Sequence, residues 1–244
     1  MNILLNAYVK LNSFDKVLVV LQEMSHKGLT PNIFTYTIII EAFSKGNKLE
    51  IAGQLFEEMK TRGLKPNVVT WNSILYGLCE VSELDKAVVL IGEMVNEGVS
   101  PNIVTYSLLM DGLCKVGQLK EAIDVFSSLP SKGLQRDVHA YTIMIKGLCK
   151  GGLIDDAYEL FKKMEDDGCS PNEYAINTMI TGFINGGHLS KVLDLVNLMT
   201  KKQFKANAIT TPLLQGLLIR HDVSDFEKES ILQVLKSKLV YSST

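Results

Sequence analysis

The chain has 244 residues, a formal net charge of −2 and an apolar fraction of 46%. This composition supports a packed core, and the near-neutral charge excludes a globally basic surface that would bind polyanions without selectivity. No run of about 18 apolar residues occurs, so the sequence predicts no membrane-spanning helix. Any contact with a polyanion must therefore depend on where individual Lys and Arg side chains lie.

One pattern returns every 35 residues along the chain. Segment 65–75 returns as segment 100–109, and related pairs stand at 31–32, 136–137, 171–172 and 206–207. A fixed period of this length predicts a stack of identical supersecondary units, because one unit buries its apolar face only against its neighbours. We therefore expect one elongated array.

Each repeat is numbered here from 1 to 35 and ends on the Asn or Asp that follows Pro in most repeats. The predicted domains are a partial repeat 1–32, full repeats 33–67, 68–102, 103–137, 138–172 and 173–207, and a degenerate C-terminal repeat with capping helices, 208–244. Each repeat holds two apolar stretches of helical spacing split by a turn. The predicted fold class is all-α, a right-handed α-solenoid (superhelix) of stacked helix-turn-helix repeats. Because the first residues already match a repeat helix, without a transit or signal segment, we expect a fragment or a shortened product.

The repeat 33–67 shows the local signals. Thr35 is a candidate N-cap of the first helix, and Gly46-Asn47 is expected to end it. Gly63 stands at the C′ site of the second helix, where a left-handed residue is needed, and Pro66 prevents continuation. Near the end of the chain, Ser224 to Glu227 resembles a capping box that opens a final helix.

Three residue types recur at fixed positions of the repeat. Small residues are expected where helices approach closely: Ala42, Gly77, Gly112, Gly147 and Gly182. Methionines are expected in the core: Met24, Met59, Met94, Met164 and Met199. Three cysteines are expected to act as small buried apolar residues: Cys79, Cys114 and Cys149. No His joins the cysteines at ligand spacing, so we expect no metal site and no cofactor. Trp71 is interpreted as packing, and the unpaired cysteines fit a reducing compartment.

Segments 68–79 and 147–157, with Glu57-Glu58-Met59 and segment 62–67, resemble the pentatricopeptide repeat family and its plain class of 35-residue units. The resemblance covers residues 1 to about 210. The Gly-Leu-Cys-Lys segments are similar to the restorer-of-fertility-like subgroup of plant organelles. The tetratricopeptide repeat, a protein-binding solenoid, has a period of 34 instead.

This resemblance implies single-stranded RNA as the partner, with one base bound per repeat, in organellar RNA processing, stability or translation. It favours the mitochondrion over the plastid. Other RNA-processing proteins are a second class of expected partner, and a monomer is expected.

In the resembled family, positions 5 and 35 of a repeat contact the base edge. Carried over, the pairs are Asn2 with Asn32, Thr37 with Asn67, Asn72 with Asn102, Ser107 with Asp137, Thr142 with Asn172, and Asn177 with Asn207. An Asp carboxylate only accepts hydrogen bonds and suits guanine and uracil, whereas Asn also donates and suits adenine and cytosine. The family's pairing rule then predicts the target 5′-YAYGAY-3′, with cytosine slightly preferred at the pyrimidine sites.

Position 2 sandwiches the base in the resembled family, and a Lys at position 13 contacts the phosphate. The stacking residues are Phe34, Val69, Val104, His139 and Tyr174, with Ile209 in the last repeat; the phosphate residues are Lys10, Lys45, Lys115 and Lys150. The alternatives are an ordinary inter-repeat core for position 2 and solvated helix-end lysines for position 13. Glu80 and Asn185 interrupt the lysine series. Four phosphate contacts predict a salt slope of about −3.

No nucleotide-binding loop, hydrolase motif or zinc deaminase signature occurs, so we expect no enzyme. The alternative to an RNA binder is a protein-interaction scaffold of helical repeats, or a non-functional fragment of a longer pentatricopeptide repeat protein.

Overall fold

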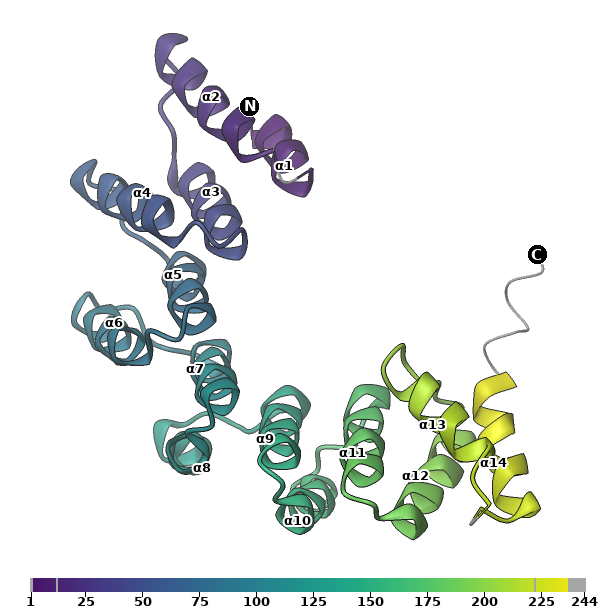
Figure 1. Cartoon of the computed structure of the whole chain (residues 1–244). Coiled ribbons are helices and arrows are strands. Elements are labelled where there is room, and N and C mark those ends of the chain that lie inside the picture. The colour runs from purple at the N-terminus through teal and green to yellow at the C-terminus, as the bar shows by residue number, and fades with distance from the viewer. Residues whose placement is uncertain (1, 12, 222, 237–244) are drawn as a thin grey trace. The chain divides into compact units, whose positions relative to one another are not determined.

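The computed structural model describes residues 2–11, 13–221 and 223–236; the side chains of Asn2, Asn6, Lys10 and Ser25 lie outside this description. Fourteen α-helices, one short 3-10 helix and no strand occur among the described residues (Figure 1). The predicted all-α solenoid class is confirmed. Within the described residues, no helix combines the length and the apolarity needed to cross a bilayer.

The first compact unit is Met1–Val116. Its helices are α1 (Asn2–Lys10), α2 (Phe14–His26), α3 (Ile33–Lys45), α4 (Leu49–Thr61), α5 (Val68–Glu80), α6 (Leu84–Asn96) and α7 (Ile103–Val116). Each odd-numbered helix packs against its even-numbered partner where both lie in this unit, and α3, α5 and α7 also pack side by side in chain order. One helix of each repeat therefore forms a row along the unit.

The second compact unit is Gly117–Thr244. It holds α8 (Leu119–Ser128), η1 (Pro130–Lys132), α9 (Val138–Lys150), α10 (Ile154–Asp166), α11 (Glu173–Asn185), α12 (Leu189–Lys202), α13 (Thr210–Leu218) and α14 (Asp225–Lys236). Helices α9, α11 and α13 form the equivalent row (Figure 1). The two units are described separately below.

The first helix of a repeat begins earlier than the sequence suggested. The prediction of Thr35 as N-cap is wrong, because Asn32 caps α3 and Thr35 stands at N3. The Asn32 carboxamide oxygen accepts from the Thr35 backbone N–H at 3.0 Å, and the Thr35 hydroxyl oxygen accepts from the Asn32 N–H at 3.3 Å. This reciprocal box satisfies two backbone donors that a helix start leaves unpaired.

The predicted stops and the final capping box are confirmed. Helix α3 ends at Lys45, before Gly46, and Gly63 has φ +76°, which a glycine adopts without the clash of a β-carbon. The Leu64 N–H then reaches the Met59 carbonyl at 3.1 Å. At the start of α14, the Ser224 N–H donates to the Glu227 carboxylate at 2.7 Å.

Close helix contacts explain the recurring small residues. A β-carbon on Gly112 would lie 3.0 Å from the Cys79 β-carbon, and one on Gly182 would lie 2.4 Å from the Cys149 sulfur. The cysteine of one repeat therefore packs on the glycine of the next. The predicted buried Met series is confirmed, as is the packing role of Trp71, whose ring meets Phe56 edge-on at 4.9 Å.

Candidate nucleic-acid interface

The last residue of a repeat caps the first helix of the next at Asn32, Asn67, Asn102 and Asn172. Asn207 makes the same kind of bond in the turn before α13, whose N-cap residue is Ile209. In each case the side-chain oxygen accepts a backbone N–H: Asn32 from Thr35 at 3.0 Å, Asn67 from Thr70 at 3.0 Å, Asn102 from Thr105 at 3.1 Å, Asn172 from Ala175 at 2.9 Å and Asn207 from Thr210 at 2.8 Å. Because capping uses the amide oxygen, the NH2 group of each Asn is the end directed away from the helix start.

Asp137 caps α9 in the same way, accepting from the Ala140 N–H at 2.8 Å. Its second carboxylate oxygen replaces the NH2 group that the Asn caps present, and that oxygen only accepts hydrogen bonds when ionised. The cap therefore fixes a donor at position 35 of five repeats and an acceptor in the repeat 103–137.

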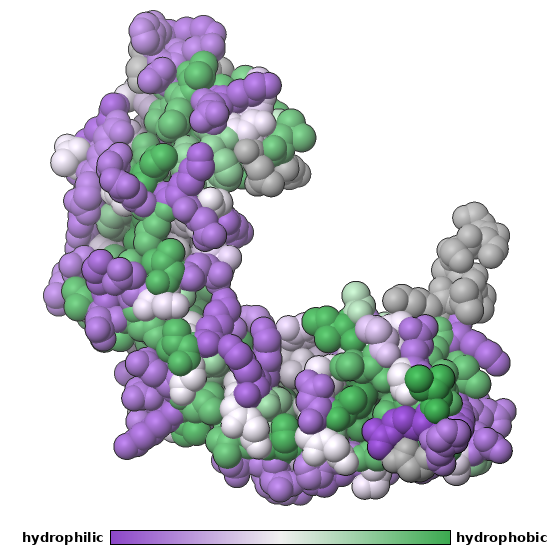
Figure 2. Space-filling model, viewed as in Figure 1, coloured by the Kyte–Doolittle hydropathy of each residue, from purple (hydrophilic) through white to green (hydrophobic). Residues whose placement is uncertain are grey.

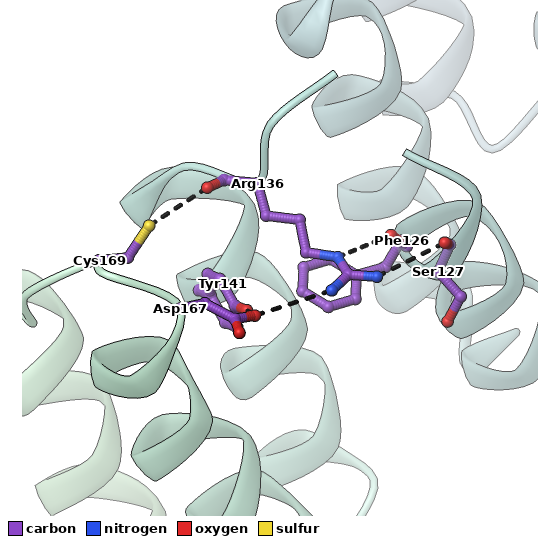
Figure 3. Close-up of polar contacts among 6 residues, drawn as sticks. All are labelled: Phe126, Ser127, Arg136, Tyr141, Asp167 and Cys169. Atoms are coloured by element: carbon purple, nitrogen blue, oxygen red, sulfur yellow. Dashed lines mark hydrogen bonds and ion pairs between the residues drawn. The ribbon is translucent and has the colours of Figure 1, made fainter. Parts of the chain in front are cut away.

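Arg136 directly precedes Asp137 in the chain. It lies in a cluster of six residues, the Arg136 cluster (Figure 3): Phe126, Ser127, Arg136, Tyr141, Asp167 and Cys169. Arg136 occupies the place of the usual Pro, and its guanidinium lies over the Phe126 ring at 4.6 Å. It donates to the Phe126 carbonyl at 3.2 Å and the Ser127 carbonyl at 3.4 Å. Those carbonyls lie at the C-terminus of α8, which ends at Ser128, two residues before Pro130.

The same cluster connects to the following repeat. The Arg136 guanidinium lies 3.8 Å from the Asp167 carboxylate, which also accepts a hydrogen bond from the Tyr141 hydroxyl. The Cys169 thiol donates to the Arg136 carbonyl at 3.2 Å. Arg136 thus connects the turn before Asp137 both to the end of α8 and to the following repeat.

Position-5 side chains are mostly buried inside their row of helices. Thr37 donates to the Ile33 carbonyl at 2.8 Å and Thr142 to the Val138 carbonyl at 2.6 Å. Ser107 is also buried, and among the described residues its hydroxyl oxygen has no hydrogen-bond partner. Asn72 is only half-buried. Any base contact by the threonines requires a hydroxyl that is already engaged with the backbone.

Two of the predicted position-5 and position-35 pairs are in direct contact. The Asn72 NH2 group donates to the Asn102 oxygen at 3.5 Å, and the Asn207 N–H donates to the Asn177 oxygen at 3.0 Å. The Asn177 NH2 group also donates to the Lys205 carbonyl at 2.9 Å.

The other pairs differ. Thr37 and Asn67 are connected through the Thr70 hydroxyl, which lies 2.7 Å from the Thr37 hydroxyl and donates to the Asn67 side-chain oxygen at 3.1 Å. Thr142 and Asn172 form no hydrogen bond with each other among the described residues: Thr142 donates to the Val138 carbonyl, and Asn172 accepts from the Ala175 N–H. Ser107 and Asp137 lie in different units, and the Asn2 side chain is outside the description. The base-contacting role of all six pairs stays a prediction.

Position-2 side chains are exposed, so the alternative of an ordinary core is wrong for them. The exposed fractions are 70% for Phe34, 49% for Val69, 51% for Val104, 52% for Tyr174 and 66% for Ile209, and His139 is exposed as well. Apolar side chains accordingly reach the surface among charged ones in both units (Figure 2). Exposed apolar groups at one repeat position favour contact with an apolar ligand face, and stacking stays a prediction.

Two cavities bring these positions together. One, of 270 Å³ in the first unit, is lined by Val69 and Val104 at position 2, by Asn72 and Asn102, and by Lys45. The other, of 260 Å³ in the second unit, is lined by the residues three repeats later: Tyr174, Ile209, Asn177, Asn207 and Lys150. Two position-2 side chains, a pair of asparagines and a position-13 lysine therefore line both cavities.

The predicted phosphate lysines lie beside carboxylates. Lys45 pairs with Glu41 at 2.6 Å, and Lys115 pairs with Glu80 at 2.5 Å and Asp111 at 2.8 Å. Burial acts to lower the pKa of Lys115, but its bonds to Asp111 and Glu80 outweigh burial and raise that pKa above its ordinary value. Lys150 lines the second cavity, and the Lys10 side chain is outside the description.

Sequence reasoning missed the partners of these lysines. Glu41 and Asp111 stand four residues before Lys45 and Lys115, a spacing that places charges on one helix face. Glu80, which interrupts the lysine series, stands one repeat before Lys115 and forms an ion pair with it. Lys146, at the same repeat position as Glu41, was also missed and lines the second cavity.

Comparison with known families gives consistent matches along the chain. The PPR repeat family matches residues 66–115, 104–150 and 137–185. The Pentatricopeptide repeat domain matches residues 19–80, and the PPR repeat matches residues 1–29 and 174–204. No curated protein matches the sequence.

Solved structures of similar fold include the pentatricopeptide repeat protein PPR10 in complex with an 18-nt psaJ RNA element. It shares 24% identity and a TM-score of 0.67 over 96% of this chain and 38% of its own. PPR10 from maize shares 26% identity and a TM-score of 0.65 over 100% of this chain and 34% of its own.

The PPR domain of Arabidopsis thaliana protein-only RNase P 1 in complex with tRNA shares 19% identity, with a TM-score of 0.56 over 72% of this chain and 93% of that domain. This chain thus spans little more than a third of PPR10. The helical pairs repeat with one period, the cavity recurs, and the family matches extend along residues 1–204. The chain therefore belongs to the pentatricopeptide repeat family.

Proposed function

We propose that the chain binds single-stranded RNA, one base per repeat, without chemistry of its own. The observation that supports this most is the repeated cavity, in which a flat ligand would lie between two position-2 side chains with an amide pair at its edge. Base stacking on such side chains contributes roughly 1–3 kcal/mol per base for aromatic residues. The proposal also draws on the RNA complex of PPR10, whose fold this chain shares.

The capping geometry supplies a reason for base selection. An Asn cap directs NH2 outward and suits the bare ring nitrogen of adenine or cytosine, whereas Asp137 directs an acceptor outward and suits the ring N–H of guanine or uracil. With the family's rule for position 5, the proposed target is 5′-YAYGAY-3′, read from the N-terminus.

The cellular role that we propose is supported by the family resemblance alone. We propose that the protein belongs to the restorer-of-fertility-like subgroup. It would work in a plant mitochondrion, in RNA processing, stability or translation. It would do so by covering RNA or by recruiting a processing enzyme. A protein-interaction scaffold is the competing function, and it predicts no preference among RNA sequences.

A binding experiment separates the two functions. Fluorescent 5′-CACGAC-3′ and a scrambled RNA of equal composition are titrated with the protein. We expect the first to bind more tightly, and equal affinity would contradict the proposed register.

A single substitution then tests the base assignment. Thr142→Asn should change the preferred fifth letter from adenine to a pyrimidine. The site tolerates this side chain, because Asn177 occupies the equivalent position in the next repeat while almost fully buried. An unchanged preference in a folded variant would reject base reading at position 5.

A further inference from the structure

The two equivalent cavities differ in charge at position 9 of the repeat. Glu41 lines the first cavity and Lys146 lines the second, each four residues before the position-13 lysine. In the first, Glu41 holds Lys45 at 2.6 Å. In the second, no acidic residue is among the described lining residues, and none of the ion pairs found in the described part of the chain includes Lys146.

Lys115 resembles Lys45 in being compensated. Its ammonium lies 2.5 Å from Glu80 and 2.8 Å from Asp111, so two carboxylates occupy the space that a phosphate oxygen would take. A phosphate approaching Lys115 or Lys45 meets both the ammonium and its carboxylate partners, whose repulsion offsets the attraction. Lys146 stands one turn before Lys150 on α9, and both line the cavity that Tyr174 also lines.

We propose that Lys146 is a phosphate-binding residue and that, together with Lys150, it makes the cavity at Tyr174 the main anchor for the RNA backbone. Glu41, Glu80 and Asp111 correspondingly mask Lys45 and Lys115. The inference rests on the proposed RNA-binding function and specifies its phosphate contacts. Tyr174 adds to the anchor, because an aromatic ring stacks on a base more strongly than the valines that line the first cavity.

Matched single substitutions test this assignment. Binding of 5′-CACGAC-3′ is measured between about 50 and 200 mM salt for the wild type, Lys146→Gln, Lys45→Gln and Glu41→Gln. Lys146→Gln should weaken binding at low salt by roughly two- to fivefold and reduce the salt slope by about 0.7, the value for one phosphate contact on a single strand. Lys45→Gln should change the slope much less.

Glu41→Gln provides the opposite test. By releasing Lys45, it should tighten binding and make the slope steeper by up to about 0.7. All three side chains are at least partly exposed, so circular dichroism melts are expected to stay unchanged and verify the fold.

The outcomes separate this inference from the proposed function. In one outcome, the wild type prefers 5′-CACGAC-3′ over its scramble, but Lys146→Gln reduces affinity and salt slope no more than Lys45→Gln does, or not at all. The proposed anchor is then wrong, and sequence-selective RNA binding stands. If the wild type binds neither RNA, the proposed function fails and the anchor fails with it.

Discussion

At the scale of single residues, one side chain at position 35 does two jobs. Its oxygen caps a helix, and under the proposed function its remaining outward atom contacts the base. Asn and Asp are both good caps, so the fold tolerates either residue while the outward atom changes from donor to acceptor. Helix capping and the proposed base selection are therefore compatible demands.

This compatibility predicts the result of Asp137→Asn. The cap on α9 should survive, since Asn caps the equivalent helices, and the unfolding free energy should change by less than about 1 kcal/mol. The preferred fourth letter should change from guanine to adenine. Binding to RNAs that vary only at the fourth letter measures the base preference, and thermal melts measure the stability. A lower melting temperature with an unchanged preference for guanine would contradict base selection by this residue.

The cysteines illustrate burial at the same scale. Burial raises the pKa of the Cys79 thiol to about 12 and that of Cys149 to about 11. Because the thiolate is the reactive form, neither residue should react with iodoacetamide near neutral pH in the folded protein. Mass spectrometry before and after unfolding checks this, and rapid native labelling of Cys79 would show that the packing against Gly112 is wrong.

At the scale of elements, the turn after each second helix requires a left-handed residue. Glycine fills that place in most repeats, with φ +76° at Gly63 and φ +79° at Gly168. After α12 the residue is Gln203, with φ 56°. A side chain in this conformation costs roughly 1–2 kcal/mol, partly offset by the entropy that glycine loses on folding.

Gln203→Gly should therefore stabilise the protein by about 0.5–1 kcal/mol. Chemical denaturation measures the change, and Gly168→Gln is the matched control, expected to destabilise by a similar amount. A lower midpoint for Gln203→Gly would mean that the glutamine makes a compensating contact.

At the scale of the whole molecule, packing between neighbouring repeats stabilises the array. Polar bonds also join the two helices within a single repeat. In the first unit Tyr36 donates to Glu58 at 2.8 Å, and in the second Tyr141 donates to Asp167. Burial first, and then the carboxylate partner, raise the pKa of each tyrosine to about 12. Each therefore holds its proton more tightly when folded than when unfolded.

The sign of this linkage predicts alkaline sensitivity in both units. The contribution is complete below about pH 10, where tyrosine keeps its proton in either state, and it is lost as pH rises toward about 12. Because solvent reaches the carboxylate partners and screens the interaction, we expect a loss of about 1 kcal/mol per tyrosine. Denaturation at pH 9 and at about pH 11.5 should show this fall. Tyr36→Phe should flatten it, and an equal fall in that variant would exclude Tyr36 as a cause.

The sequence by itself determined the period, the helical pairs, the close glycine contacts and the residues at each repeat position, because these depend on spacing and on local backbone preference. The sequence alone placed the start of α3 wrongly, because Asn32 and Thr35 are both plausible N-caps. The reciprocal hydrogen bonds between them are visible only in three dimensions. The sequence could not place Glu80 against Lys115 either. That pairing depends on two helices of successive repeats lying side by side, which brings residues 35 apart into contact.

Tertiary packing likewise decided which candidate site residues are exposed. Position-2 side chains project outward, and the threonines at position 5 are buried and bonded to their own helix. Exposure depends on the neighbouring helix that covers one face of each residue, and a periodic pattern cannot say which of two similar faces is covered. The arrangement of charges around each lysine follows from the same packing, so only the structure could distinguish a masked lysine from Lys146.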